Sequence, residues 1–215
     1  MAKLSKILLM AMFSIVSLVG CESTYYSTME KFGVEKRDIL VDRIEETRDI
    51  QEEAQQQFRD ALDQYRSVVN FTGGELEEIY DRLRVEYEGS EMVSKQIANH
   101  IRQVEDVSED LFEEWESELS QIKSAALRND SAQKLRETQS RSKQLIQAMW
   151  RAEQSVHPVL DSLRDQVYYL KHNLNARAVA ALKGELRIID ADVSRLVTQM
   201  QNSINEANAF IEALQ

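Results

Sequence analysis

The chain has 215 residues, and its 37 acidic residues outnumber its 26 lysines and arginines, for a formal net charge of −11 at pH 7. A polyanion of this kind is a poor ligand for nucleic acid, because the phosphate backbone repels it. Only one proline and six glycines are present, so the chain cannot make many turns and we expect long helices.

The first 20 residues have the pattern of a secretory signal peptide. Lys3 and Lys6 precede an uncharged stretch over residues 7–20, which ends in the small residue Gly20. This stretch is shorter than the roughly 20 apolar residues that a bilayer-spanning helix needs. We therefore expect it to be removed rather than to remain as a membrane span.

The only cysteine, Cys21, follows this segment directly and has no second cysteine with which to form a disulfide. Leu18, Val19, Gly20 and Cys21 resemble the lipobox of bacterial lipoproteins. The resemblance implies a thioether-linked diacylglycerol on Cys21, cleavage before this residue, and acylation of the freed amine, with palmitate among the acyl groups. Three acyl chains exceed the two signals that stable anchoring requires.

The residue after the cysteine indicates the membrane in which we expect the protein to be anchored. Glu22 stands where lipoproteins retained in the inner membrane usually carry Asp, so the resemblance implies the inner leaflet of the outer membrane, facing the periplasm. Loss of the leader leaves 24 bases against 37 acids, a net charge of −13, so we expect the lipid rather than the anionic body to hold the membrane. Tyr25 and Tyr26 would suit the membrane interface or a contact with a partner.

We expect three parts: a lipoprotein signal peptide over residues 1–20, a lipidated tether over residues 21–34, and one long-helix bundle domain over residues 35–215. The first predicted helix spans about residues 35–70, and Gly73 and Gly74 end it. Its apolar seam steps by three and four, as in a heptad pattern: Leu40, Ile44, Thr47, Gln51, Ala54, Phe58, Ala61, Tyr65 and Val68.

The second predicted helix begins near Glu75 and contains Gly89, which is either a hinge or a tolerated glycine. A turn is predicted over residues 127–131, where Asp130 or Ser131 would cap the third helix. Pro158 lies inside that third helix and is expected to kink it.

A fourth helix is expected after a break somewhere in residues 171–179, although an uninterrupted helix across this segment is the alternative. The predicted fold is all-α, an elongated antiparallel coiled-coil helical bundle of three to four long helices.

The second and third predicted helices carry opposite charge where they would meet. Residues 105–118 hold eight acids and no base, and the start of the third helix is rich in lysine and arginine. We expect an antiparallel hairpin with Glu113 near Lys143 and Glu105 near Arg151, since the charges would select the register.

Residues that could carry chemistry are scarce. His100, His157 and His172 have no acidic residue three positions before them, so the helical di-iron pattern is missing. Glu153 shares a helix face with His157, but two ligands do not make a zinc site. No Gly-rich nucleophile or phosphate motif is present. We therefore expect no catalytic residue, no metal site and no cofactor, and not an enzyme.

The two tryptophans are the best candidates for partner anchors in the helices. Trp115 lies on the apolar seam and is expected in the core. Trp150 lies beside the seam and is expected at its rim, where it could contact a partner.

Four stretches together are similar to an uncharacterised family of proteobacterial helical lipoproteins, catalogued only as a domain of unknown function. They are "YYSTMEKFGVEKRDILVDRIE", "FTGGELEEIYDRL", "LFEEWESEL" and "PVLDSLRDQVYYLKHNLNARAVAALKGEL". The resemblance covers nearly the whole mature chain. It implies a coiled-coil lipoprotein and supplies no activity, ligand or catalytic residue.

The expected function is that of a non-enzymatic envelope lipoprotein, a periplasmic coiled-coil spacer, adaptor or scaffold. The alternative is an envelope binding module that holds a lipid or another apolar ligand between its helices. The expected partners are the membrane, through the lipid anchor, and either other envelope proteins or further copies of the chain.

Overall fold

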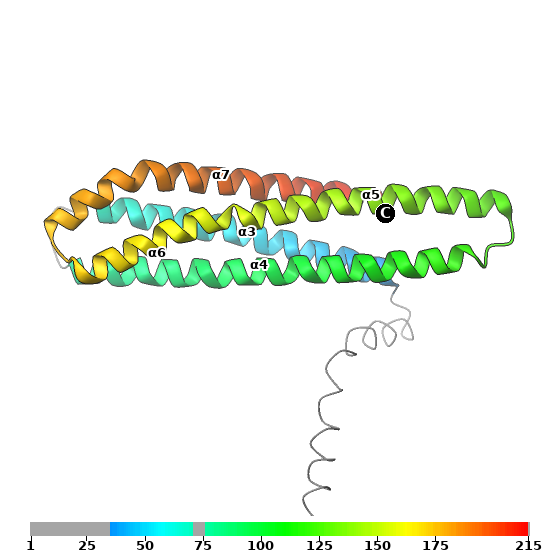
Figure 1. Ribbon diagram of the computed structural model, residues 1–215, viewed down its shortest axis with the longest axis horizontal. Helices are drawn as coiled ribbons and strands as arrows, with labels where there is room; N and C mark the ends of the chain where they lie inside the picture. Colours follow the sequence, from blue (N-terminus) through cyan, green and yellow to red (C-terminus); the bar gives the residue numbers. More distant parts are fainter. Residues whose placement is uncertain (1–34, 71–75, 215) are drawn as a thin grey trace, which may run out of the picture. The chain divides into compact units, whose positions relative to one another are not determined.

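The computed structural model describes residues 35–70 and 76–214, and these residues are helical with short connections and no strand (Figure 1). The predicted all-α fold is therefore confirmed. The predicted signal peptide, the lipobox with Cys21, and Tyr25 and Tyr26 lie outside the described residues. The helices are α3 (Lys36–Val69), α4 (Leu76–Leu119), α5 (Ala125–Gln154), α6 (Val156–His172) and α7 (Ala176–Leu214).

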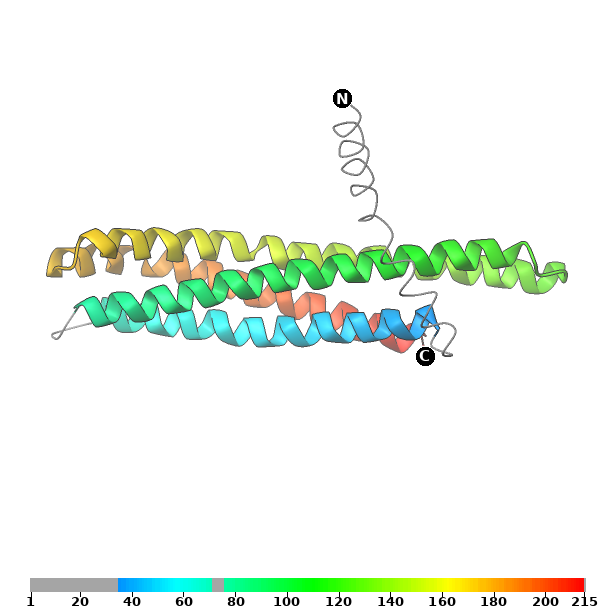
Figure 2. The same ribbon diagram turned by 90° about the horizontal axis from the view of Figure 1, so that it is seen from below.

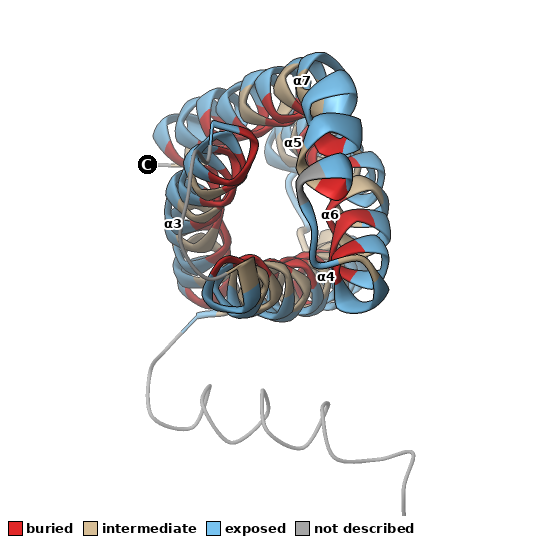
Figure 3. Cartoon of the chain, turned by 90° about the vertical axis from the view of Figure 1, so that its left-hand side faces the viewer, coloured by how far each residue is buried: buried red, intermediate tan, exposed pale blue. Residues whose placement is uncertain are grey.

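The backbone divides into two units, Met1–Ile39 and Leu40–Gln215, and the packing described below lies within the second. There α3, α4, the consecutive pair α5–α6, and α7 form four columns around a shared core, and Figure 3 shows the buried positions lining the inside. Figure 2 shows α3 alongside α4. Consecutive columns run in opposite directions, so the predicted antiparallel bundle is confirmed.

The core consists of the seams that the apolar spacing predicts. Every seam position predicted on the first helix, from Leu40 to Val68, is fully buried. Phe58 and Tyr65 are the largest of these side chains, and Leu83 and Leu163 are buried as completely on α4 and α6. Full burial of one large apolar side chain contributes about 1.5–3 kcal/mol, so these seams stabilise the bundle.

Close approach explains the glycine within α4. The helix runs through Gly89 without interruption, and a Cβ at this position would lie 3.2 Å from Nε2 of Gln57 on α3. Gly89 therefore gives the side chain of Gln57 room between the two helices, and it is not a break in α4.

The predicted break between the last two helices is confirmed. α6 ends at His172 and α7 begins at Ala176. The side chain of Asn175 accepts hydrogen bonds from the backbone N–H groups of Arg177 (3.0 Å) and Ala178 (3.2 Å). An asparagine at this position caps a helix, so the segment turns without glycine or proline.

The predicted turn at residues 127–131 is wrong. The chain turns over residues 120–124, and Ser124 caps α5 by accepting a hydrogen bond from the N–H of Leu127. Asp130 and Ser131, the predicted caps, lie inside α5. Capping by Ser124 pairs one of the first N–H groups of the helix and starts α5 before Asn129 and Asp130, so these two turn-forming residues lie in its first turns.

The third predicted helix is interrupted near its proline, as expected. α5 ends at Gln154 and α6 starts at Val156, with Ser155 between them. Pro158 has no N–H to donate to the carbonyl of Gln154, so the ladder of backbone hydrogen bonds is broken at this point. The hydroxyl of Ser155 donates to the carbonyl of Ala152 at 2.6 Å, which occupies one of the carbonyls at the end of α5.

A candidate interaction arm

The hairpin of α4 and α5 continues beyond the C-terminal end of α7, where the other columns stop (Figures 1 and 2). We call residues 109–141 the arm. At its base Ser108 of α4 and Ser142 of α5 are buried, and their hydroxyl oxygens lie 3.3 Å apart in a hydrogen bond. Only two helices run side by side in the arm.

Burial falls along the arm, although Leu135 of α5 is still buried there. On α4 the seam is buried as far as Ser108, while Leu111, Phe112 and Trp115 are only partly buried. On α5 the side chain of Leu127 is 64 % exposed. Two helices cannot enclose an apolar seam from all sides, so the arm presents a partly open apolar face.

Polar contacts hold the two helices of the arm together. The indole Nε1 of Trp115 donates to the hydroxyl of Ser131 at 2.8 Å, and Nε2 of Gln139 donates to a carboxylate oxygen of Glu116 at 3.1 Å. The predicted antiparallel hairpin of the second and third helices is thus confirmed. Trp115 is less buried than predicted, because the arm has no further helix to cover it.

Glu105 and Glu116 of α4 both bond neutral donors, and for Glu105 this differs from the predicted pairing with Arg151. Glu105 accepts a hydrogen bond from the indole of Trp150 at 2.8 Å, and Arg151, its predicted partner, is exposed. Glu116 accepts a hydrogen bond from the side-chain amide of Gln139. The donors at these positions are therefore neutral, and Trp150 lies at the rim of the seam as predicted.

The charges of the arm are segregated by helix. The α4 side carries six acids and no base: Glu109, Asp110, Glu113, Glu114, Glu116 and Glu118. The turn and the α5 side carry five bases, Lys123, Arg128, Lys134, Arg136 and Arg141, against the two acids Asp130 and Glu137. The two helices of the arm thus carry opposite net charge, which favours one orientation of a docked partner.

Two of the three histidines singled out in the sequence, His157 and His100, lie near carboxylates. His157 Nε2 lies 3.3 Å from the buried carboxylate of Glu153, and His100 Nδ1 lies 3.8 Å from Glu46 of α3. Within the described ranges, no three His, Cys, Asp or Glu side chains gather where a metal ion could be held. No helix in that part of the chain is long and apolar enough to cross a membrane.

Comparison with models of known protein families shows which family the chain belongs to. The family described as "Protein of unknown function (DUF2959)" has a model that matches residues 25–214. The chain belongs to this family. The match confirms the resemblance to an uncharacterised family, and it spans the bundle and arm of this DUF2959 protein alike. No curated protein and no solved structure matches the chain significantly.

Proposed function

We propose that this DUF2959 protein is a non-enzymatic envelope lipoprotein, anchored through lipidated Cys21, that acts as a scaffold and presents its arm to other envelope proteins. The observation that carries the proposal is the partly open apolar face of the arm, with Leu111, Trp115 and Leu127 beyond the point where the bundle encloses its seam.

The arm has the physical properties of a contact surface. Covering apolar area contributes roughly 25 cal/mol per Å², and tryptophans are frequent among the residues that dominate binding energy. The acidic α4 edge and the basic α5 edge would orient the partner and reject others by like-charge repulsion.

The body supplies the reach of a spacer. α4 has 44 residues, and at 1.5 Å per residue it is about 66 Å long. Packed columns of this length would hold the arm far from the opposite end of the bundle, which supports a role in spacing or bridging.

Packing favours the scaffold over a module that binds an apolar ligand. Phe58, Tyr65 and Leu163 have no exposed surface, so no space the size of a water molecule adjoins them. An apolar ligand would need such unfilled volume between the seams.

The proposal is tested by placing a photo-crosslinking amino acid at Leu127 of the full-length, lipidated protein in its native envelope. A matched control carries the same amino acid at Ile188 of α7, whose side chain is 50 % exposed on the body. We expect a discrete adduct from position 127 and none from position 188. Equal labelling at both positions, or none at position 127, would contradict the contact role.

A further inference from the structure

A polar side chain occupies the centre of the bundle without any partner. Gln51 of α3 is fully buried, and neither its amide nitrogen nor its amide oxygen has a hydrogen-bond partner. An unpaired buried polar group keeps its full desolvation cost. Gln51 therefore opposes the packing of the apolar layers on either side of it.

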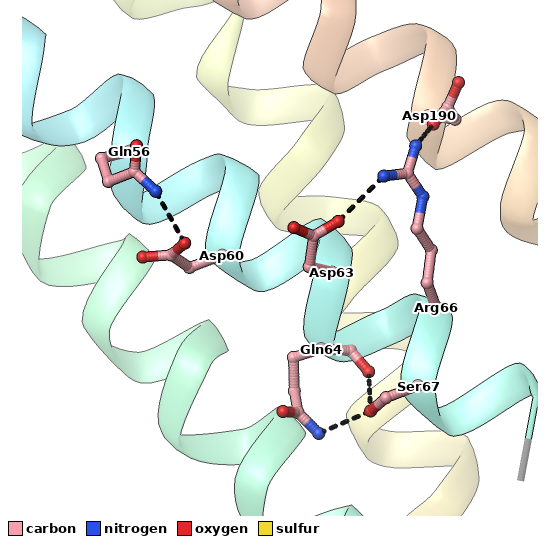
Figure 4. A network of polar contacts seen from close by, with 7 residues as sticks. All are labelled: Gln56, Asp60, Asp63, Gln64, Arg66, Ser67 and Asp190. Carbon is pink, nitrogen blue, oxygen red and sulfur yellow. Dashed lines mark hydrogen bonds and ion pairs between the residues drawn. The ribbon is translucent and has the colours of Figure 1, made fainter.

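Contacts between the columns locate this residue along the bundle. Two contacts join α3 to α4: Gln57 bonds Glu86, and Glu46 lies beside His100. Gln51 lies between Glu46 and Gln57 on α3, so it is level with about residues 92–95 of α4. On α7, Asn208 is bonded by Arg48, and Asp190 is bonded by Arg66 (Figure 4), which places Gln51 level with about residue 205.

The neighbouring helices carry small polar residues at this level. Ser203 of α7 is fully buried, and its hydroxyl has no partner. On α4, Ser94 is buried, and Ser90 is fully buried one turn away with its hydroxyl unpartnered. Three of the four columns thus bring a core hydroxyl or amide to one level.

The fourth column is broken at nearly the same level. Trp150 of α5 bonds Glu105, and farther along α4 the phenol of Tyr87 lies near the α6 residues Tyr168, Arg164 and Asp161, whose charges act on it. Interpolation between these contacts places Pro158 within about one turn of the Gln51 level and Ser155 one to two turns from it. The interruption in the backbone ladder of this column therefore lies within one to two turns of the polar layer.

We propose that this level is a hydration site and hinge, where the bundle opens locally and water enters to bond Gln51, Ser203 and Ser94. A buried water needs two to four polar partners, which this layer supplies. The fully buried side chains leave no room for water in the packed form, so hydration requires the helices to separate. The break at Ser155 lets the α5–α6 column bend when the helices separate.

Hydrogen exchange on the full-length protein tests the hinge. In the wild type we expect backbone amides of residues 47–55 and 199–207 to exchange about tenfold faster than those beside Phe58 or Leu196, because local opening is less costly there. Gln51→Leu and Ser203→Ala should slow exchange at this level about tenfold and raise the Tm. Gln56→Leu, the same change on the exposed face of α3, is the control and should do neither.

Several outcomes would overturn the hinge. They are uniform exchange along α3 in the wild type, unchanged or faster exchange in Gln51→Leu, and equal slowing by the Gln56→Leu control. Gln51→Met is a second variant, because the branched leucine could destabilise the core by its shape alone. The unbranched side chain of methionine follows the shape of glutamine. A lower Tm in both Gln51 variants would show that the amide stabilises the packed bundle and would refute the proposal.

Discussion

At the scale of single residues, Tyr65 joins α3 to α7. Its ring is fully buried, and its hydroxyl donates to the main-chain carbonyl of Leu182 at 2.6 Å. The aromatic body fills the seam while the hydroxyl supplies one directional bond between columns. The residue therefore contributes both apolar burial and a fixed register.

Removing only the hydroxyl separates these two contributions. We expect Tyr65→Phe to lower the free energy of unfolding by about 0.5–1.5 kcal/mol, the usual net contribution of one hydrogen bond. Urea titration followed by circular dichroism measures the change. Ile188→Val, a comparably small truncation at an exposed site, serves as the control, and an unchanged midpoint in Tyr65→Phe would contradict the assigned bond.

The same phenol predicts a loss of stability in alkali. Burial, with the charge of Glu185 as a second cause, raises the pKa of Tyr65 well above its ordinary value of 10.0. The contribution of the protonated Tyr65 phenol to the free energy of unfolding is complete below pH 10. It falls as the pH rises further, because the unfolded chain loses the phenol proton while the folded chain keeps it.

We expect the free energy of unfolding to fall between pH 10 and pH 11 by up to about 1.4 kcal/mol more in the wild type than in Tyr65→Phe. Urea titrations of both proteins at pH 9, 10 and 11 measure this difference. Parallel pH profiles for the two proteins would show that Tyr65 does not titrate differently in the folded state.

At the scale of elements, the α4–α5 hairpin has the best-defined register, because Ser108 and Ser142 meet at the base of the arm. Their hydroxyl oxygens lie 3.3 Å apart, so the two side chains point toward each other across the hairpin. We expect Ser108→Cys and Ser142→Cys, combined with Cys21→Ser, to form a disulfide within one chain under mild oxidation.

Electrophoretic mobility without reductant, with mass spectrometry of the linked peptides, detects this bond. The control pairs cysteine at position 142 with cysteine at position 120, in the turn at the tip of the arm, and should remain reduced. Equal oxidation of both pairs, or oxidation of the control alone, would refute the hairpin register.

Local patterns predicted the helices better than their connections. The spacing from Leu40 to Val68 specified the buried face of α3 because an apolar seam repeats once per two turns. Asn129 and Asp130 suggested a turn, yet Ser124 caps α5 earlier in the chain. A serine can cap a helix or lie on its surface, and the tertiary position of the hairpin decides between these roles.

The open face of the arm could not be read from its own residues. Leu111 and Trp115 have the same spacing as the buried Ile97 and Ile101, since periodicity marks a seam without saying how many helices cover it. The greater length of the second helix relative to the first was the available signal, because an overhanging hairpin must leave part of its seam open.

At the scale of the whole molecule, the proposed scaffold depends on a lipid anchor, because its anionic body has no hold of its own on the membrane. We expect Cys21→Ser to move the protein from the membrane fraction to the soluble fraction, because residues 21–215 carry a net charge of −13. Detergent-phase partitioning measures this, with Ser23→Ala as the control that should stay membrane-bound. Unchanged partitioning of Cys21→Ser would refute the anchor.

If the arm is the contact site of a scaffold, it is dispensable for folding and necessary for assembly. Replacing residues 109–141 by a short glycine-containing turn between Ser108 and Ser142 leaves the four covered columns intact. The direct measurement is the mass of the complex that the lipidated protein forms after mild detergent extraction. We expect the shortened protein to keep its helical circular dichroism and to migrate at its own mass, while the wild type migrates as a larger complex. Equal complex sizes for a folded shortened protein and the wild type would contradict the claim.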